Sequence, residues 1–100
     1  MPESKRHRII WLPEAVQDIA RLKDFIYPKN RNASRRAANR IQEVVRILEN
    51  NPEAGRPVLG LAGFRDQIIP FGAGAYVLRY RHNAEIAIVR VWHSKEDRAH

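Results

Sequence analysis

Three short runs rich in β-branched and aromatic residues follow one another in the last third of the chain, over residues 64–70, 75–81 and 85–91. The connections between them are only a few residues long and contain Gly72 and Asn83, residue types that accept the positive φ of tight turns. Connections this short require neighbouring strands to be antiparallel. The sequence therefore predicts a three-stranded meander, and the residues before it have to cover one of its faces.

Alternation along each strand sorts the side chains of the meander between two faces. We expect the inner face to carry Phe64, Ile68, Tyr76, Leu78 and Tyr80. The open face would then be basic, with Arg65, Gln67, Arg79 and Arg81. The third strand stays open, because its inner set is either Ile86 and Ile88 or Ala87, Val89 and Val91.

The residues before the meander indicate one strand and two helices. A run that is first basic and then apolar, over residues 6–12, is a candidate strand, and Pro13 suits the first turn of a helix because its missing N–H is not needed there. Apolar residues then recur at helical spacing to about Tyr27. A second helical stripe follows a cap at Asn32 or Ser34 and stops before Pro52.

The order of these elements predicts the fold. A β-α-α-β-β-β chain with a short break between its helices forms an antiparallel helical hairpin. We predict an α+β fold in which this hairpin packs on a mostly antiparallel four-stranded sheet, with a long connection over residues 53–63. One hundred residues make a single domain, residues 1–100.

Composition narrows the function classes. The chain has no cysteine, which excludes disulfides and thiolate metal sites and makes a cytoplasmic location the expectation. No apolar run approaches the ~20 residues of a membrane span. The histidines are not spaced as metal ligands, so we expect neither metal nor cofactor; they stand at His7, His82, His93 and His100. The formal net charge of +7 favours an acidic partner, either nucleic acid, ribosome or protein.

The helical hairpin carries features of a docking surface. Phe25 and Ile47 both fall outside the apolar stripes of their helices. Single exposed apolar residues are ordinary, whereas two on one hairpin are typical of a dock for a partner helix. An acid-free cluster of cations lies beside them, at Lys29, Arg31, Arg35, Arg36 and Arg40. We interpret Phe25, Ile47, Arg35, Arg36 and Arg40 as a candidate surface for an acidic, amphipathic partner; the alternative is a solvated face.

One group of residues could carry chemistry. RNA cleavage without a metal needs a base for the 2′-hydroxyl, cations around the phosphate and an acid for the leaving oxygen. His93 and Lys95 in the polar tail, with Arg65 and Arg81 of the basic face, could supply these groups. The plainer interpretation, which we favour, is that His93 ends its strand with its ring held by hydrogen bonds.

Several phrases of the chain, taken in order, are similar to one known family. They are LPEAVQDI at 12–19, NPEAGRP at 51–57, GFR at 63–65, AYVLRYR at 75–81 and RVWHSKEDR at 90–98. On these phrases the chain resembles, over nearly its whole length, the ParE/RelE superfamily of small bacterial toxins from type II toxin–antitoxin systems, also called plasmid-stabilisation proteins. The resemblance implies the RelE/ParE toxin fold. It also implies a hetero-oligomer with a cognate antitoxin, whose C-terminal segment wraps the toxin as a helix and an extended strand.

The superfamily divides by target: RelE-like members cleave mRNA on the ribosome, and ParE-like members poison DNA gyrase. The RelE-like constellation is incomplete here. Its two strand lysines are answered by Arg65 and Gln67, its catalytic arginine by Val77, and its tail arginine by Lys95. Its terminal tyrosine has no counterpart. Other nuclease members pair a tail histidine with a glutamate; His93 matches in position, and Glu53 is the nearest glutamate.

The resemblance thus favours a ParE-like toxin that poisons gyrase, is not an enzyme and is neutralised by an antitoxin. For gyrase contact it points to the open sheet face and tail, at Arg65, Arg79, Arg81, His93, Lys95 and Arg98. The alternative is a metal-independent, ribosome-dependent mRNA endonuclease whose chemistry is carried by Arg65, Arg81, His93 and Lys95.

Overall fold

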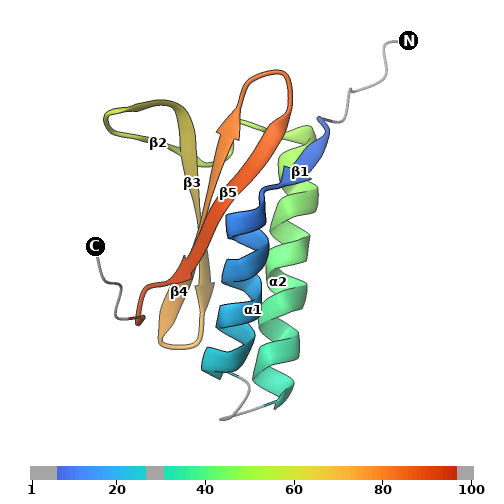
Figure 1. Ribbon diagram of the computed structural model, residues 1–100, viewed down its shortest axis with the longest axis vertical. Coiled ribbons are helices and arrows are strands. Elements are labelled where there is room, and N and C mark those ends of the chain that lie inside the picture. Colours follow the sequence, from blue (N-terminus) through green and yellow to red (C-terminus); the bar gives the residue numbers. More distant parts are fainter. Residues whose placement is uncertain (1–6, 27–30, 97–100) are drawn as a thin grey trace.

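The computed structural model describes residues 7–26 and 31–96, and the side chains of residues 24–26 lie outside that description. Its elements follow in the order β1 (Ile9–Trp11), α1 (Pro13–Ile26), α2 (Arg31–Asn50), β2 (Arg56–Val58), β3 (Leu61–Phe71), β4 (Gly74–His82) and β5 (Ile86–His93) (Figure 1). The predicted α+β fold and the order of its helices and strands are confirmed with one addition. The connection expected to be a loop contains β2, so the sheet has five strands where four were predicted.

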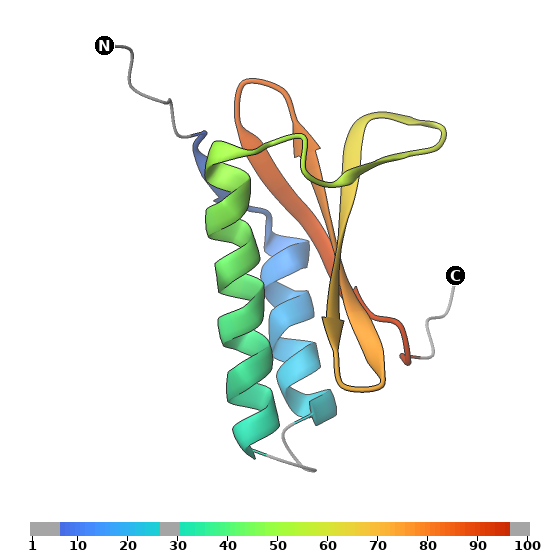
Figure 2. The ribbon, with the colours of Figure 1, turned by 180° about the vertical axis from the view of Figure 1, so that it is seen from behind.

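The sheet runs in the order β1-β5-β4-β3-β2. β1 pairs in parallel with β5, and all other neighbours are antiparallel. The two helices lie side by side on one face of this sheet, and the β2–β3 hairpin projects away from them (Figures 1 and 2). No helix among the described residues is long and apolar enough to cross a membrane.

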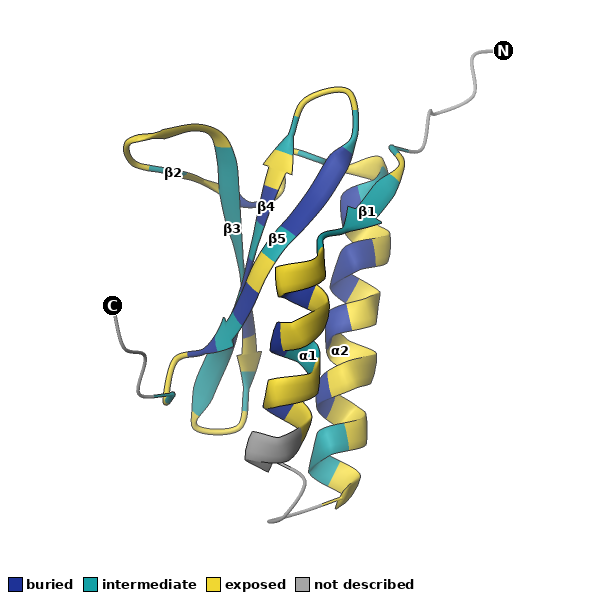
Figure 3. Ribbon diagram, viewed as in Figure 1, coloured by how far each residue is buried: buried dark blue, intermediate teal, exposed yellow. Residues whose placement is uncertain are grey.

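The core lies between the helical hairpin and the inner face of the sheet (Figure 3). The helices contribute most of the stripes that their periodicity predicts, with Ala15 and Leu22 from α1 and Ala37, Ile41, Val44, Val45 and Leu48 from α2. Val16 and Ala38, which have the same helical spacing, are exposed. The sheet contributes Ile69, Tyr76, Leu78, Tyr80, Ile86, Ile88 and Val91. At about 25 cal/mol for each Å² of apolar surface removed from water, this burial is the main favourable term in folding.

The face assigned to β3 from its sequence is wrong. Arg65 pairs with Tyr80 and Ile69 pairs with Tyr76, and residues paired across an antiparallel ladder share a face. The inner residues of β3 are therefore Arg65, Gln67 and Ile69, and those facing outward include Phe64 and Ile68. Ile68 and Ile69 are consecutive, so alternation alone could not decide which of them points to the core. The predicted grouping of Arg65 with Arg79 and Arg81 on one open face does not hold.

A register shift explains why β5 could not be assigned to one inner set. Tyr80 pairs with Ile88, but its neighbour Arg79 pairs with Arg90, which leaves Val89 as the extra residue of a β-bulge. Ile86 and Ile88 point inward before the bulge, and Val91 and His93 do so after it. Each of the two predicted alternatives holds for one half of the strand.

Candidate functional site

The outer edge of β5 is covered along its length. Its first half is paired with β1, and Leu12 N–H continues the pairing by donating to the Ile88 carbonyl at 3.0 Å. Beyond that point, side chains take over. Asp18 on α1 accepts the Val91 N–H at 2.8 Å, and Arg21 on the next turn donates to the Val91 carbonyl at 3.1 Å. These two side chains make the contacts that a neighbouring strand would make.

Asp18 is also the centre of an ionic network. Its carboxylate, 2% exposed, accepts from Arg90 at 2.8 and 3.1 Å and from Arg21. Arg21 in turn binds Glu96 of the tail at 2.7 and 3.1 Å. Burial alone would raise the pKa of Asp18, but the hydrogen bonds from Arg90, the Val91 backbone and Arg21 together lower it below its usual value. The network fixes α1, β5 and the tail to one another.

His93 is held at the point where β5 ends. Its side chain is nearly buried, and its ring packs edge-on against Tyr76 with centroids 4.8 Å apart. The Lys95 N–H donates to its Nδ1 at 3.0 Å, which leaves the ring proton on Nε2 for the backbone bond with Phe71. Burial lowers the pKa of His93, and Lys95 adds to this lowering, against the opposing effect of Glu96. The ring is neutral and engaged at both nitrogens.

We expect this histidine to make stability depend on pH. Its pKa lies below 6.5 in the folded chain and near 6.5 in the unfolded chain, so the unfolded state binds the extra proton. Stability should therefore be full above pH 6.5 and fall as the pH drops from 6.5 to the folded pKa, by at most about 1.4 kcal/mol per pH unit. Urea denaturation between pH 7 and pH 5 measures the slope. His93→Gln, which cannot titrate, should remove it; an unchanged slope in that variant would contradict this origin.

The arginines of the open face are differently engaged. Arg79 forms a two-pronged bond with Asp66 at 2.8 and 2.9 Å and lies over the Trp92 ring at 5.2 Å. The hydrogen bonds that Arg79 donates to Asp66 raise the pKa of Arg79 and hold its guanidinium against the sheet. Arg81, opposite Phe64, is exposed. Only one of these two predicted contact residues therefore presents its charge to solvent.

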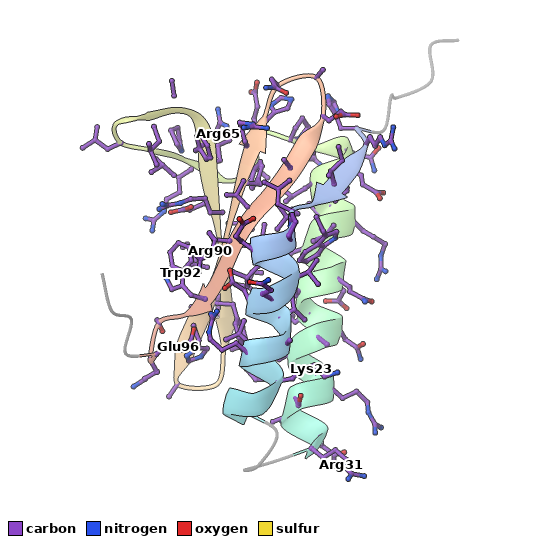
Figure 4. The ribbon with its side chains drawn as sticks, in the orientation of Figure 1. Lys23, Arg31, Arg65, Arg90, Trp92 and Glu96 are labelled. Atoms are coloured by element: carbon purple, nitrogen blue, oxygen red, sulfur yellow. The ribbon has the colours of Figure 1, made fainter. Side chains whose placement is uncertain are left out.

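Arg65 lies on the other side of the sheet. Its guanidinium donates to the Gly55 carbonyl at 2.7 Å and to the Glu53 carbonyl at 3.3 Å, so it fastens the connection that leads into β2. The Tyr80 hydroxyl also binds this connection. It accepts a hydrogen bond from the Gly55 N–H at 2.9 Å and donates one to the Pro52 carbonyl at 2.7 Å. Figure 4 shows Arg65 at the end of the sheet that carries the β2–β3 hairpin, away from Glu96.

The structure does not bring the predicted nuclease residues together. His93 pairs with Tyr76, five positions along β4 from Arg81, which corresponds to about 17 Å. Arg65 faces inward at the end of the sheet that holds Arg81, and Lys95 is exposed beyond His93. Glu53 is exposed beside Arg65 and far along the sheet from His93. Arg98 lies outside the described residues. No metal-binding cluster of three or more His, Cys, Asp or Glu occurs within residues 7–26 and 31–96.

A groove of about 460 Å³ runs between the two helices. Its lining is mostly apolar or small and consists of Trp11, Val16, Ile19, Leu22, Lys23, Ser34, Ala37, Ala38, Ile41, Gln42 and Tyr76. Val16 is 54% exposed, and the Tyr76 hydroxyl is buried without a hydrogen-bond partner in the part of the chain that the structure describes. Burial raises the pKa of Tyr76 to about 12. Sequence analysis missed this groove, although the small residues at 33–34 and 37–38 were its visible sign.

The predicted docking residues surround the groove only in part. Arg35 is exposed and lies about one helical turn before Ala38 of the groove, and Lys23 belongs to the facing wall (Figure 4 labels Lys23). Arg36 and Arg40 are exposed farther round α2, and Arg40 pairs with Glu43 at 3.2 Å. Ile47 is 52% exposed but lines a different hollow, with Asn51, Pro52, Glu53 and Ala54. The side chain of Phe25 lies outside the described residues.

Comparisons of the sequence with known proteins identify a family, and a comparison of the structure supports its fold. The family described as "ParE toxin of type II toxin-antitoxin system, parDE" matches residues 9–98. The chain is 32% identical over 85 residues to Toxin RelE1 of Caulobacter vibrioides, covering 84% of this chain and 89% of that protein. The structure is similar to a chain from a chromosomal ParDE TA system of P. aeruginosa, with a TM-score of 0.66 and 23% identity over 86% of this chain and 94% of that one. At this level of identity, the structural similarity supports the fold alone.

Proposed function

The chain belongs to the family of ParE toxins of type II toxin–antitoxin systems, and on that premise we propose that it binds and poisons DNA gyrase and is held inactive by a cognate antitoxin. It acts on gyrase as a binding protein without cutting a substrate itself. Broken DNA then accumulates because the trapped gyrase cannot reseal it. The partners are an acidic antitoxin and gyrase, and neither a metal nor a cofactor takes part.

The observation that supports binding over RNA cleavage is that the four candidate catalytic residues lie at two opposite ends of β4, with His93 and Lys95 at one end and Arg65 and Arg81 at the other. A general base and the cations around one phosphate have to lie within hydrogen-bond reach of the same substrate atoms. His93 is neutral and bound at both nitrogens, Arg65 is bound to backbone carbonyls, and Arg81 lies about 17 Å along the sheet from His93. At the position of the nuclease arginine, Val77 lies between Ile68 and Trp92 and offers no charge.

The groove between α1 and α2 supports the antitoxin half of the proposal. It is apolar along its floor, and Lys23 and Arg35 provide cations at its rim. An amphipathic helix places apolar side chains at i, i+3, i+4 and i+7 on one face, which suits a groove of this kind. Acidic residues beside that face would pair with the rim and with Arg36 and Arg40. The antitoxin segment is therefore an acidic, amphipathic helix, and the contact surface includes Val16, Ile19 and Ala38.

A ribosome-dependent mRNA endonuclease is the second candidate, and the similarity to a protein named RelE1 is the observation that favours it. The two functions are separated by one pair of assays. With purified gyrase, ATP and supercoiled plasmid, we expect linear, gyrase-bound DNA to accumulate as the toxin is added. In a bacterial translation extract, reporter mRNA should remain intact at the same toxin concentration. Intact plasmid together with mRNA cut within codons would overturn the gyrase assignment.

A further inference from the structure

The β2–β3 hairpin ends in an apolar tip that none of the described residues, 7–26 and 31–96, covers. Leu59 is 101% exposed and Leu61 is 44% exposed, and they flank Gly60 at the turn. Both views of the ribbon show the hairpin projecting from the body of the molecule, and its tip is among the exposed parts in Figure 3. We call residues 57–62 the hairpin tip.

The turn itself does not require a leucine. Gly60 is the second central residue of the turn and supplies its positive φ, 83°. No atom lies within 4 Å of the position that a Cβ of residue 60 would take. The first central position, occupied by Leu59, accepts most residues, and proline or a polar residue is the ordinary choice there. The unfavourable free energy of exposing this leucine to water is removed only when another molecule covers the side chain.

The edge of β2 is unsuited to pairing with a further strand. Pro57 has no N–H to donate, and the register between β2 and β3 shifts between Pro57 and Val58. A partner therefore contacts the side chains of the tip instead of extending the sheet. A convex tip with an exposed leucine at its end buries that side chain best in an apolar pocket of a partner.

Charge decides which molecule provides that pocket. Residues 56–64 contain Arg56 and no acid, Arg81 is exposed opposite Phe64, and the carboxylate of Asp66 is held by Arg79. The apolar groove of a second copy has Lys23 and Arg35 at its rim, so insertion of the tip there would bring like charges together. The matching pocket is bordered by carboxylates and belongs to a different protein.

We propose that the hairpin tip inserts Leu59 into an apolar, acid-rimmed pocket on the target protein of this toxin. The assignment to the target, and not to the antitoxin, follows from position: none of the residues lining the groove between α1 and α2 belongs to β2 or β3. An antitoxin segment in the groove leaves the tip exposed. This inference rests on the proposed function in two respects, namely that the toxin acts by binding a protein and that the antitoxin segment occupies the groove.

The test replaces the leucine by aspartate. Leu59→Asp should weaken toxin potency about 30-fold, the loss typical of a hot-spot side chain, in growth inhibition and in accumulation of linear DNA by purified gyrase. Leu59→Met should retain potency within about threefold, because methionine fills apolar pockets equally well. The melting temperature and the affinity for the antitoxin, the latter by calorimetry, should match those of the unaltered chain because Leu59 contacts neither the core nor the groove.

Ala73→Asp is the matched control. It introduces the same charge at the exposed second position of the β3–β4 turn, where Gly72 carries the positive φ of 63°. Equal losses in Leu59→Asp and Ala73→Asp, or potency of Leu59→Asp within twofold of the unaltered toxin, would overturn the inference. If the unaltered toxin inhibits growth without producing linear DNA, the gyrase assignment fails while the growth assay still decides the role of Leu59. A chain that does not inhibit growth at all contradicts both.

Discussion

Replacing Asp18 by alanine is expected to lower the free energy of unfolding by about 3 kcal/mol. The substitution leaves the buried Val91 N–H without an acceptor, which by itself costs about 1–3 kcal/mol. It also removes the common partner of Arg21 and Arg90. Those two side chains are 42% and 44% exposed, so water compensates much of their loss and the effect stays below that of a fully buried ion pair. Urea denaturation at pH 7 measures the difference.

Two variants show where this effect originates. Glu43→Ala removes the exposed partner of Arg40 and should cost less than about 1 kcal/mol, as surface pairs do. Asp18→Asn keeps an oxygen acceptor for Val91 but loses the charge, and it should fall between the other two. If Asp18→Ala costs no more than Glu43→Ala, the network does not hold α1 against β5 in the way described.

Substituting Gly55 by alanine is expected to destabilise the fold by about 1–3 kcal/mol. A Cβ at this position would lie 2.8 Å from the Tyr80 hydroxyl and 3.0 Å from the Asp66 carbonyl oxygen, and both distances are too short. The hydroxyl cannot move aside without losing its bonds to the Gly55 N–H and the Pro52 carbonyl. The connection into β2 would have to shift instead, and with it the base of the hairpin.

Tyr80→Phe provides the test of that mechanism. Alone it should cost about 1–3 kcal/mol, because the buried Gly55 N–H and the partly buried Pro52 carbonyl lose their partner. Combined with Gly55→Ala it should cost less than the sum of the two, because the missing hydroxyl leaves part of the space that the new methyl group needs. Thermal and urea denaturation of the four chains give the coupling; strict additivity would rule out the steric account.

The parts of the fold that sequence analysis predicted correctly are those in which one pattern admits one solution. The helical stripes through Ile41 and Leu48 can face only one core, and the short turns at Gly72 and Asn83 force antiparallel neighbours. The short strand β2 was not predicted, because its three residues, Arg56 to Val58, include a proline and show no alternation of polar and apolar side chains. The inner face of β3 was assigned wrongly because Ile68 and Ile69 are consecutive, so the alternating pattern fits equally well with either of them in the core.

The candidate site was less predictable, because its residues depend on contacts between distant segments. Nothing local in the sequence indicates that Arg65 binds the Gly55 carbonyl or that Arg79 is held by Asp66. The plainer interpretation of His93, a strand-end residue with its ring hydrogen bonded, agrees with its contacts to Lys95 and Phe71. The groove was missed because the sequence pattern of an apolar helix residue is the same whether the side chain packs in the core or lines an open groove. Ile19 is such a residue and lines the groove.

The cover that Asp18 and Arg21 provide over Val91 has a consequence for the protein when it is released from its partner. A sheet with an exposed, unpaired edge strand can pair with the edge strands of other copies and grow into insoluble fibrils. Here the edge strand β1 has only three residues, side chains from α1 cover β5 beyond it, and the opposite edge strand β2 is interrupted by Pro57. We therefore expect the chain to resist aggregation through its sheet edges when no antitoxin is bound to it.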